Sequence, residues 1–195
     1  MSQSQKPPLP AQAQLRADAK ANRDRIMEVA REALTADPLV SLNAIAKAAG
    51  VGPGTLYRHF ATREALVLAV YRHEIDVQVA LAPRLLAAHP PLQAFRLWCD
   101  QLVEMGKVKH GIADLLHAAR AGQNLEDSYG PMLGAVRQLM AASEAAGAIR
   151  PGGDPADFLT LLGLLWQIPP TAEGQARARR LLGLAFRGLG AEEAA

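Results

Sequence analysis

Hydrophobic residues recur along most of this chain at spacings of three and four, which is the period of an α-helix with one buried face. No segment alternates apolar and polar residues over the length of a strand. Proline and glycine separate the periodic segments and mark their ends. The pattern therefore predicts an all-α protein.

The first 90 residues divide into a tail and four predicted helices. Residues 1–17 begin with a Pro- and Gln-rich stretch that is expected to be disordered. A helix over 18–36 ends at Asp37-Pro38, since the residue before a proline disfavours helical geometry. Two short helices are predicted within 41–64, and a longer one starts near Thr62 and runs to about Ala88.

The rest of the chain is predicted to form further helices, which are separated by proline and glycine residues. They are expected at about 92–108, directly after Gly111, at about 131–146, from Asp154-Pro155 onward, and at about 172–189, with a loop over 122–130. The segment FLTLLGLLWQI is apolar nearly all round, so one side needs a cover beyond its own domain. This favours a homodimer through the last two helices, with burial in a monomer core as the alternative.

Composition excludes several classes of protein. No stretch approaches the ~18 continuous apolar residues of a membrane span, and the N-terminus lacks the features of a secretory signal. We therefore expect a cytoplasmic protein that does not bind a membrane. The single cysteine, Cys99, excludes an intramolecular disulfide and the common zinc patterns, so no metal or cofactor is predicted. Residues 1–73 hold ten Lys/Arg against six Asp/Glu, a net of +4, although the whole chain carries only +2.

Residues 41–64, SLNAIAKAAGVGPGTLYRHFATRE, carry the clearest functional pattern. Ser41 is suited to cap the first short helix, and Gly50 permits a sharp reversal after it. Gly52-Pro53 then starts a second helix, because proline is tolerated at the first helical position. Leu56 and Phe60 point that helix inward, and its other residues are small, hydroxylated, aromatic or basic. This arrangement predicts a helix-turn-helix that binds DNA.

The run AAGVGPGTLYRHFATREAL resembles the pattern of the TetR/AcrR family of dimeric, ligand-responsive transcriptional regulators. That pattern is I-A-x-x-A-G-V-S-x-G-T-L-Y-x-H-F-x-x-K-E-x-L, and the chain departs from it at Gly52 and Arg63. The matching residues are Ile45, Ala46, Ala49, Gly50, Val51, Gly54, Thr55, Leu56, Tyr57, His59, Phe60, Glu64 and Leu66. The match covers only the first third of the chain.

The resemblance implies an N-terminal homeodomain-like three-helix domain over 18–65, linked by a long helix to a helical effector-binding and dimerisation domain over 66–195. It assigns Thr55 and Tyr57 to DNA phosphates. Arg58 is the strongest candidate for reading a guanine, since its fork can meet O6 and N7 together. The full DNA-binding set comprises Ser41, Asn43, Lys47, Pro53, Gly54, Thr55, Tyr57, Arg58, His59 and Arg63. As alternatives, Tyr57 covers the small core, His59 caps a helix and Arg58 is a solvated charge.

The resemblance also implies a small-molecule effector that releases a repressor from a palindromic operator. Aromatic, Met and polar residues of the middle helices are the candidates to line its pocket: Phe95, Trp98, Leu102, Met105, His117, Tyr129 and Trp166. Such residues at helical spacing also serve as ordinary core. An architectural DNA-binding protein without effector control is the alternative function. A helical enzyme is disfavoured, since no acid pair, Ser/His/Asp set or metal-ligand spacing occurs.

Overall fold

A computed structural model describes residues 11–37, 39–111, 126–165, 167–169 and 171–191 of the 195-residue chain. Within these ranges the chain forms helices and no strands, which confirms the all-α prediction. The N-terminal helices are α1 (Ala11–Ala36), α2 (Leu42–Ala48), α3 (Pro53–His59) and α4 (Arg63–Ala88). The remaining helices are α5 (Pro91–Gly111), α7 (Glu126–Ala145), α8 (Pro155–Leu165) and α9 (Ala172–Gly188).

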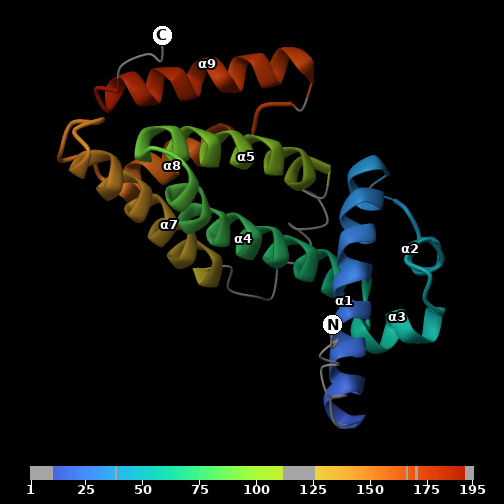
Figure 1. Ribbon diagram of the computed structural model, residues 1–195. Coiled ribbons are helices and arrows are strands. Elements are labelled where there is room, and N and C mark those ends of the chain that lie inside the picture. The colour runs from blue at the N-terminus through green and yellow to red at the C-terminus, as the bar shows by residue number, and fades with distance from the viewer. Residues whose placement is uncertain (1–10, 38, 112–125, 166, 170, 192–195) are drawn as a thin grey trace, which may run out of the picture.

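The short helices α2 and α3 lie beside α1 at one end of the molecule, and α4 runs from them into a body formed by α5, α7, α8 and α9 (Figure 1). Helix α9 is the outermost layer, at the end opposite to α3 (Figure 1). Because α4 packs on α1 as well as on α5 and α7, it joins the two parts of the fold.

Side-chain oxygens fix the beginnings of four helices. Ser41 and Thr62 accept hydrogen bonds from the backbone N–H groups of Ala44 and Ala65, both at 3.1 Å, and so cap α2 and α4. Asp154 accepts from the N–H of Ala156 at 2.6 Å before α8, and Thr171 accepts from Gly174 at 3.0 Å before α9. Each bond satisfies a donor that the helix itself leaves free. The predicted cap at Ser41 and the predicted start of the long helix near Thr62 are confirmed.

Two helices begin earlier than the periodicity predicts. Helix α1 starts at Ala11, whereas the prediction began at residue 18 and left the residues before it as a disordered tail. Helix α7 starts at Glu126, inside the segment 122–130 that was expected to be a loop. Pro131 lies near the N-terminal end of α7 and removes only one intrahelical hydrogen bond, so the helix passes through it. The helix expected after Gly111 lies outside the described residues.

The core is continuous from α1 to α9. In the body, the ring of Phe95 lies 5.0 Å from those of both Phe158 and Phe186, joining α5, α8 and α9. Helices α4 and α5 exchange two buried hydrogen bonds: Gln78 Nε2 donates to the carbonyl of Trp98, and Trp98 Nε1 donates to that of Gln78, both at 2.8 Å. None of the described helices combines the length and apolarity needed to cross a lipid bilayer.

Candidate nucleic-acid interface

The turn between α2 and α3 is closed by its own backbone. Gly50 adopts a φ of +68°, a left-handed conformation that favours glycine. Its N–H donates to the carbonyl of Lys47 at 3.1 Å, and the N–H of Val51 donates to that of Ala46 at 3.0 Å. These two bonds satisfy the free carbonyls at the end of α2. The sharp reversal predicted at Gly50 is therefore present.

The inner faces of α2 and α3 hold the pair in place. Ile45, Ala46 and Leu56 are fully buried, and Phe60, at the C-terminal end of α3, is 2% exposed. Leu42, the first residue of α2, is only half-buried and packs against the edge of this core. The orientation of α3 therefore depends on apolar contacts, which leaves its polar residues on the outside.

The outer face brings together most of the predicted DNA-binding residues. On α3, Pro53, Gly54, Tyr57 and Arg58 are exposed, and Tyr57 keeps 46% of its surface accessible. Asn43 and Lys47 of α2 are exposed as well. An added Cβ at Gly54 would meet nothing within 4 Å, so the backbone there is open to a close partner. The result is an apolar, hydroxylated and basic surface on a short helix.

Some candidates already have partners within the chain. The half-buried Thr55 accepts a hydrogen bond from Arg58 Nη2 through its Oγ1 at 3.0 Å. The hydroxyl of Ser41 serves as the cap of α2. The half-buried His59 has its ring 6.3 Å from that of Phe60.

Arg63 has a structural role that the sequence does not reveal. Its Nη1 donates a hydrogen bond to the carbonyl of Val40, in the segment that precedes α2. The part-buried guanidinium thus ties the beginning of α4 to the entrance of the helix-turn-helix. Contact with phosphate remains a prediction for this residue.

One cationic side chain of α1 also approaches the site. The guanidinium carbon of Arg23 lies 5.4 Å from the centre of the Phe60 ring, a geometry typical of a cation–π contact. Arg23 lies outside the segment 41–64, within which the sequence pattern predicts the site. The signal available in the sequence was its helical spacing to the apolar Met27 and Ala30, which places Arg23 on the same face of α1 as these residues.

The effector candidates lie in different environments. Phe95 and Trp98 are fully buried, Leu102 is 1% exposed, and all three pack in the body. Met105 lines a groove between α1, α4 and α5, whereas Tyr129 is 48% exposed on α7. His117 and Trp166 lie outside the described residues. The pocket assigned to these seven residues remains a prediction.

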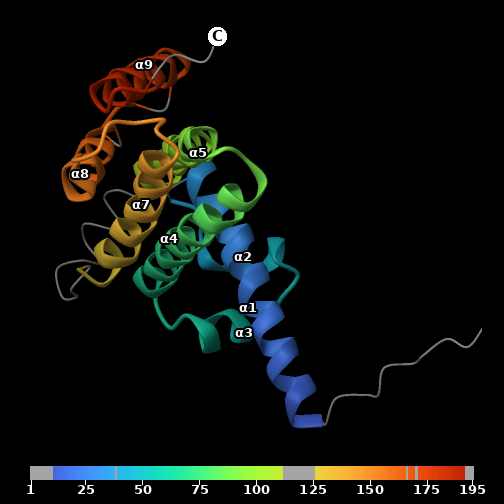
Figure 2. The same cartoon turned by 60° about the vertical axis from the view of Figure 1, so that its left-hand side comes forward.

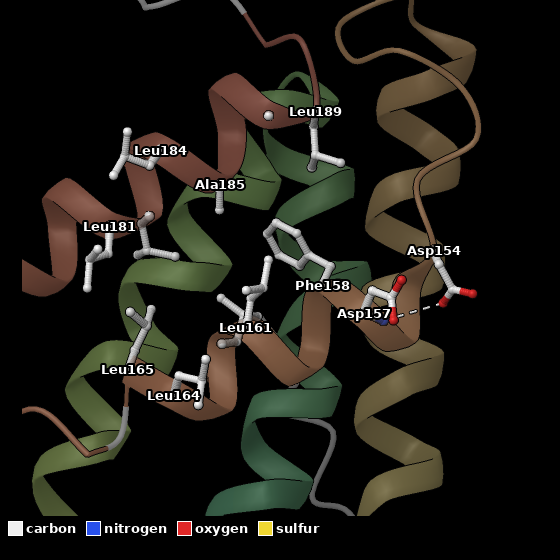
Figure 3. Close-up of a pocket in the computed structure, with 13 residues that line it drawn as sticks. Asp154, Asp157, Phe158, Leu161, Leu164, Leu165, Leu181, Leu184, Ala185 and Leu189 are labelled. Carbon is white, nitrogen blue, oxygen red and sulfur yellow. Dashed lines mark hydrogen bonds between the residues drawn. The ribbon is translucent and has the colours of Figure 1, made fainter.

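Helices α8 and α9 form an open apolar groove of about 480 Å³ between them (Figure 3). Their inner residues Phe158, Leu162, Leu182 and Phe186 are buried in the body. Four other leucines remain exposed on the same two helices: Leu161 (51%), Leu164 (55%), Leu181 (37%) and Leu184 (56%). Each helix is therefore apolar on two sides, one of which has no cover within the described chain.

A second groove of about 480 Å³ lies where α1, α4 and α5 meet. Arg31 of α1 approaches Glu74 of α4 at 3.7 Å and also pairs with Glu28 at 3.2 Å. Burial raises the pKa of Glu74, and the nearby Arg31 partly opposes this rise. This joint connects the helix that supports α2 and α3 with the helices of the body.

The paired short helices, the glycine turn and the basic outer face define a helix-turn-helix protein of the DNA-binding class. Residues 26–70 match the family model for bacterial regulatory proteins of the tetR family. Residues 90–191 match the model for the C-terminal domain of SbtR-like transcriptional regulators. The chain belongs to the TetR family of transcriptional regulators.

Solved structures agree with this assignment over nearly the whole chain. The TetR transcriptional regulator SCO0520 from Streptomyces coelicolor is 38% identical, with a TM-score of 0.77 over 86% of this chain and 97% of that one. A TetR regulatory protein from Mycobacterium vanbaalenii is 34% identical, with a TM-score of 0.74. The match covers 90% of this chain and 98% of that chain.

The curated relatives match over a smaller share of their length. The HTH-type transcriptional regulator SAR2658 of Staphylococcus aureus (strain MRSA252) is 33% identical over 113 residues, which is 56% of this chain and 60% of that protein. The regulator SAUSA300_2515 of S. aureus (strain USA300) is 42% identical over 65 residues, or 32% of this chain and 35% of that one.

Proposed function

We propose that this protein is a homodimeric repressor that binds a palindromic operator and is released from it by a small molecule. The observation that carries the proposal is the outer face of α3, where Pro53, Gly54, Tyr57 and Arg58 are exposed above a buried Leu56. A helix of this kind can enter the major groove, which admits an α-helix. Such a regulator acts where the chromosome lies, so we place it in the cytoplasm.

The contacts at the operator divide into positioning and base recognition. Tyr57, Thr55 and the exposed Lys47 would bind phosphates, which fix the register of the protein without reading sequence. The guanidinium of Arg58 would donate two hydrogen bonds to O6 and N7 of a guanine. It can do so with its hydrogen bond to the Thr55 hydroxyl either kept or broken. Pro53 and Asn43 would add contacts that differ between operators.

The exposed leucines of α8 and α9 support the dimer. Burial of apolar surface stabilises association by about 25 cal/mol per Å², and four leucines that remain 37–56% exposed are an unusual surface for a monomer. A two-fold axis would place the α3 helices of the two copies about one DNA turn apart, roughly 34–36 Å.

Release by an effector requires two states of the dimer. Helix α4 begins beside the helix-turn-helix and contacts α5 and α7 in the body, so a displacement of α4 would move α3. The effector must bind the released state more tightly, with a coupling of typically ~1–3 kcal/mol. We place the effector among the body helices, near the predicted set around Phe95, Trp98 and Met105.

Selection of bound sequences from a random DNA pool tests the proposal. The enriched sequences should share an inverted repeat with half-sites one helical turn apart, and the purified protein should shift that duplex in a gel. Enrichment of no sequence would contradict specific operator binding. A screen of small molecules for release from that duplex then tests the effector. If ligands bind the protein without changing operator affinity, an architectural DNA-binding protein becomes the better description.

A further inference from the structure

The N-terminal half of α1 extends beyond the rest of the molecule. In two views of the structure it projects past α3 and away from the body helices (Figures 1 and 2). Residues 19–25 of α1 are exposed apart from the half-buried Asn22, and Ile26, which follows them, is buried. At 1.5 Å per residue, the segment 11–25 is ~22 Å long.

One face of α1 changes its chemistry where the protein core ends. Met27, Ala30 and Leu34 form the buried stripe, spaced by three and four residues. The same spacing continued toward the N-terminus leads to Arg23 and then Lys20, both exposed. The face that contacts protein is thus continued by a face that carries positive charge.

Arg23 joins this stripe to the recognition helix. Its guanidinium lies 5.4 Å from the centre of the Phe60 ring, directly after α3. Lys20 is one turn further along the same face of α1. Because Arg23 contacts Phe60 and Lys20 lies one turn closer to the N-terminal end of α1, the two cations extend from the edge of the α3 surface along α1.

We propose that Lys20 and Arg23 bind phosphates of the DNA strand beside the groove that α3 enters. This inference rests on the proposed function, because it needs DNA at α3. A regularly spaced row of phosphates suits cations that repeat every three to four residues on one helix face. Continuity with the α3 surface favours DNA over an acidic protein as the partner.

The test uses the full chain and a duplex carrying the sequence enriched in the selection described above. Lys20→Gln removes one charge per copy, and therefore two per dimer, without touching the cation–π contact of Arg23. Each lost phosphate contact lowers the slope of log K against log salt by ~0.9, so the slope of a dimer should fall by ~2. Affinity at 0.1 M salt should fall by about tenfold or more.

Arg25→Gln is the matched control. Arg25 is exposed on the same helix, two residues from Arg23, and a step of 100° per residue places it on the opposite face. Arg25→Gln removes the same charge from a side chain that does not face the DNA. The slope of log K against log salt should therefore stay nearly unchanged. Equal slopes for Lys20→Gln and Arg25→Gln, with wild-type operator binding intact, would overturn this inference and leave the proposed function standing. Thermal unfolding of each variant verifies the fold.

Discussion

Arg58 is the residue on which sequence recognition depends most. Its guanidinium is exposed and already held by Thr55 at 3.0 Å, so part of its conformational freedom is lost before DNA arrives. Arg58→Ala should cost ~1–3 kcal/mol on the operator and should relax the preference at one base pair in each half-site. Anisotropy titrations with the operator and with single-base variants measure both effects. Arg137→Ala, an exposed arginine on α7, is the control. An equal loss on every sequence would assign Arg58 to phosphate instead.

Arg63 shows how a residue expected to bind DNA can also hold the site together. Arg63→Met removes every side-chain donor to the carbonyl of Val40, and leaving a part-buried acceptor unsatisfied costs about 1–3 kcal/mol. We expect a lower urea midpoint together with weaker operator binding. Arg58→Ala, at an exposed position, should leave the urea midpoint unchanged and so separates binding from stability. An unchanged midpoint in Arg63→Met would show that the Val40 contact contributes nothing to the fold.

At the scale of helices, the periodicity predicted the number and order of the described elements well and their ends less well. The predicted N-terminal end of α7 was wrong because Pro131 is typical of the first residue of a helix, whereas α7 begins five residues before it. The early start of α1 had no apolar signal, since residues 11–17, AQAQLRA, hold a single large apolar residue and no apolar repeat at helical spacing. A prediction based on apolar periodicity therefore could not extend the helix into this segment.

The candidate site was predictable wherever local spacing decides it. The turn at Gly50, the buried Leu56 and the exposed Tyr57 and Arg58 all follow from the spacing within 41–64. Contacts between distant segments were not predictable from one sequence. The Arg63 bond to Val40 spans 23 residues and the Gln78–Trp98 exchange spans 20, and neither leaves a periodic trace.

The joint between α1 and α4 should make stability depend on pH. Burial raises the pKa of Glu74 in the folded chain, so the folded state binds its proton more tightly than the unfolded state does. Stability from this group is therefore present at low pH and is lost as pH rises through the raised folded pKa. Glu74→Gln should flatten the fall in unfolding free energy on going from mildly acidic to neutral pH. Urea titrations across that range measure it, and Asp76→Asn, an exposed acid on the same helix, should retain the wild-type slope.

At the scale of the whole molecule, the two ends of the fold present different surfaces. The end at α3 is basic, with Lys20, Arg23 and Arg58 exposed, whereas α8 and α9 at the opposite end expose leucines. Helix α4 connects them through α5 and α7. A homodimer through α8 and α9 would fix the distance between two copies of α3, so that assembly at one end controls recognition at the other.

The leucine face therefore offers the sharpest test of how assembly and DNA binding are linked. Leu161→Glu and Leu184→Glu each place a charge on the exposed side of α8 or α9, while Phe158 and Leu182 still fill the core beneath. Burying an unpaired carboxylate in an interface is costly, so the double variant should sediment as a monomer with little change in its own unfolding. Leu39→Glu, at an 86% exposed position near α1, adds the same charge elsewhere and should leave the dimer intact.

A monomeric double variant should also lose most of its operator affinity while keeping weak, salt-dependent binding to any duplex. Each α3 then binds its half-site alone, and the gain from holding two sites on one body disappears. Sedimentation velocity gives the mass, and gel shifts on whole and half operators give the affinities. If the double variant sediments as wild type does, the partner lies on another face. If it is monomeric yet binds the whole operator with unchanged affinity, assembly through α8 and α9 does not position the recognition helices.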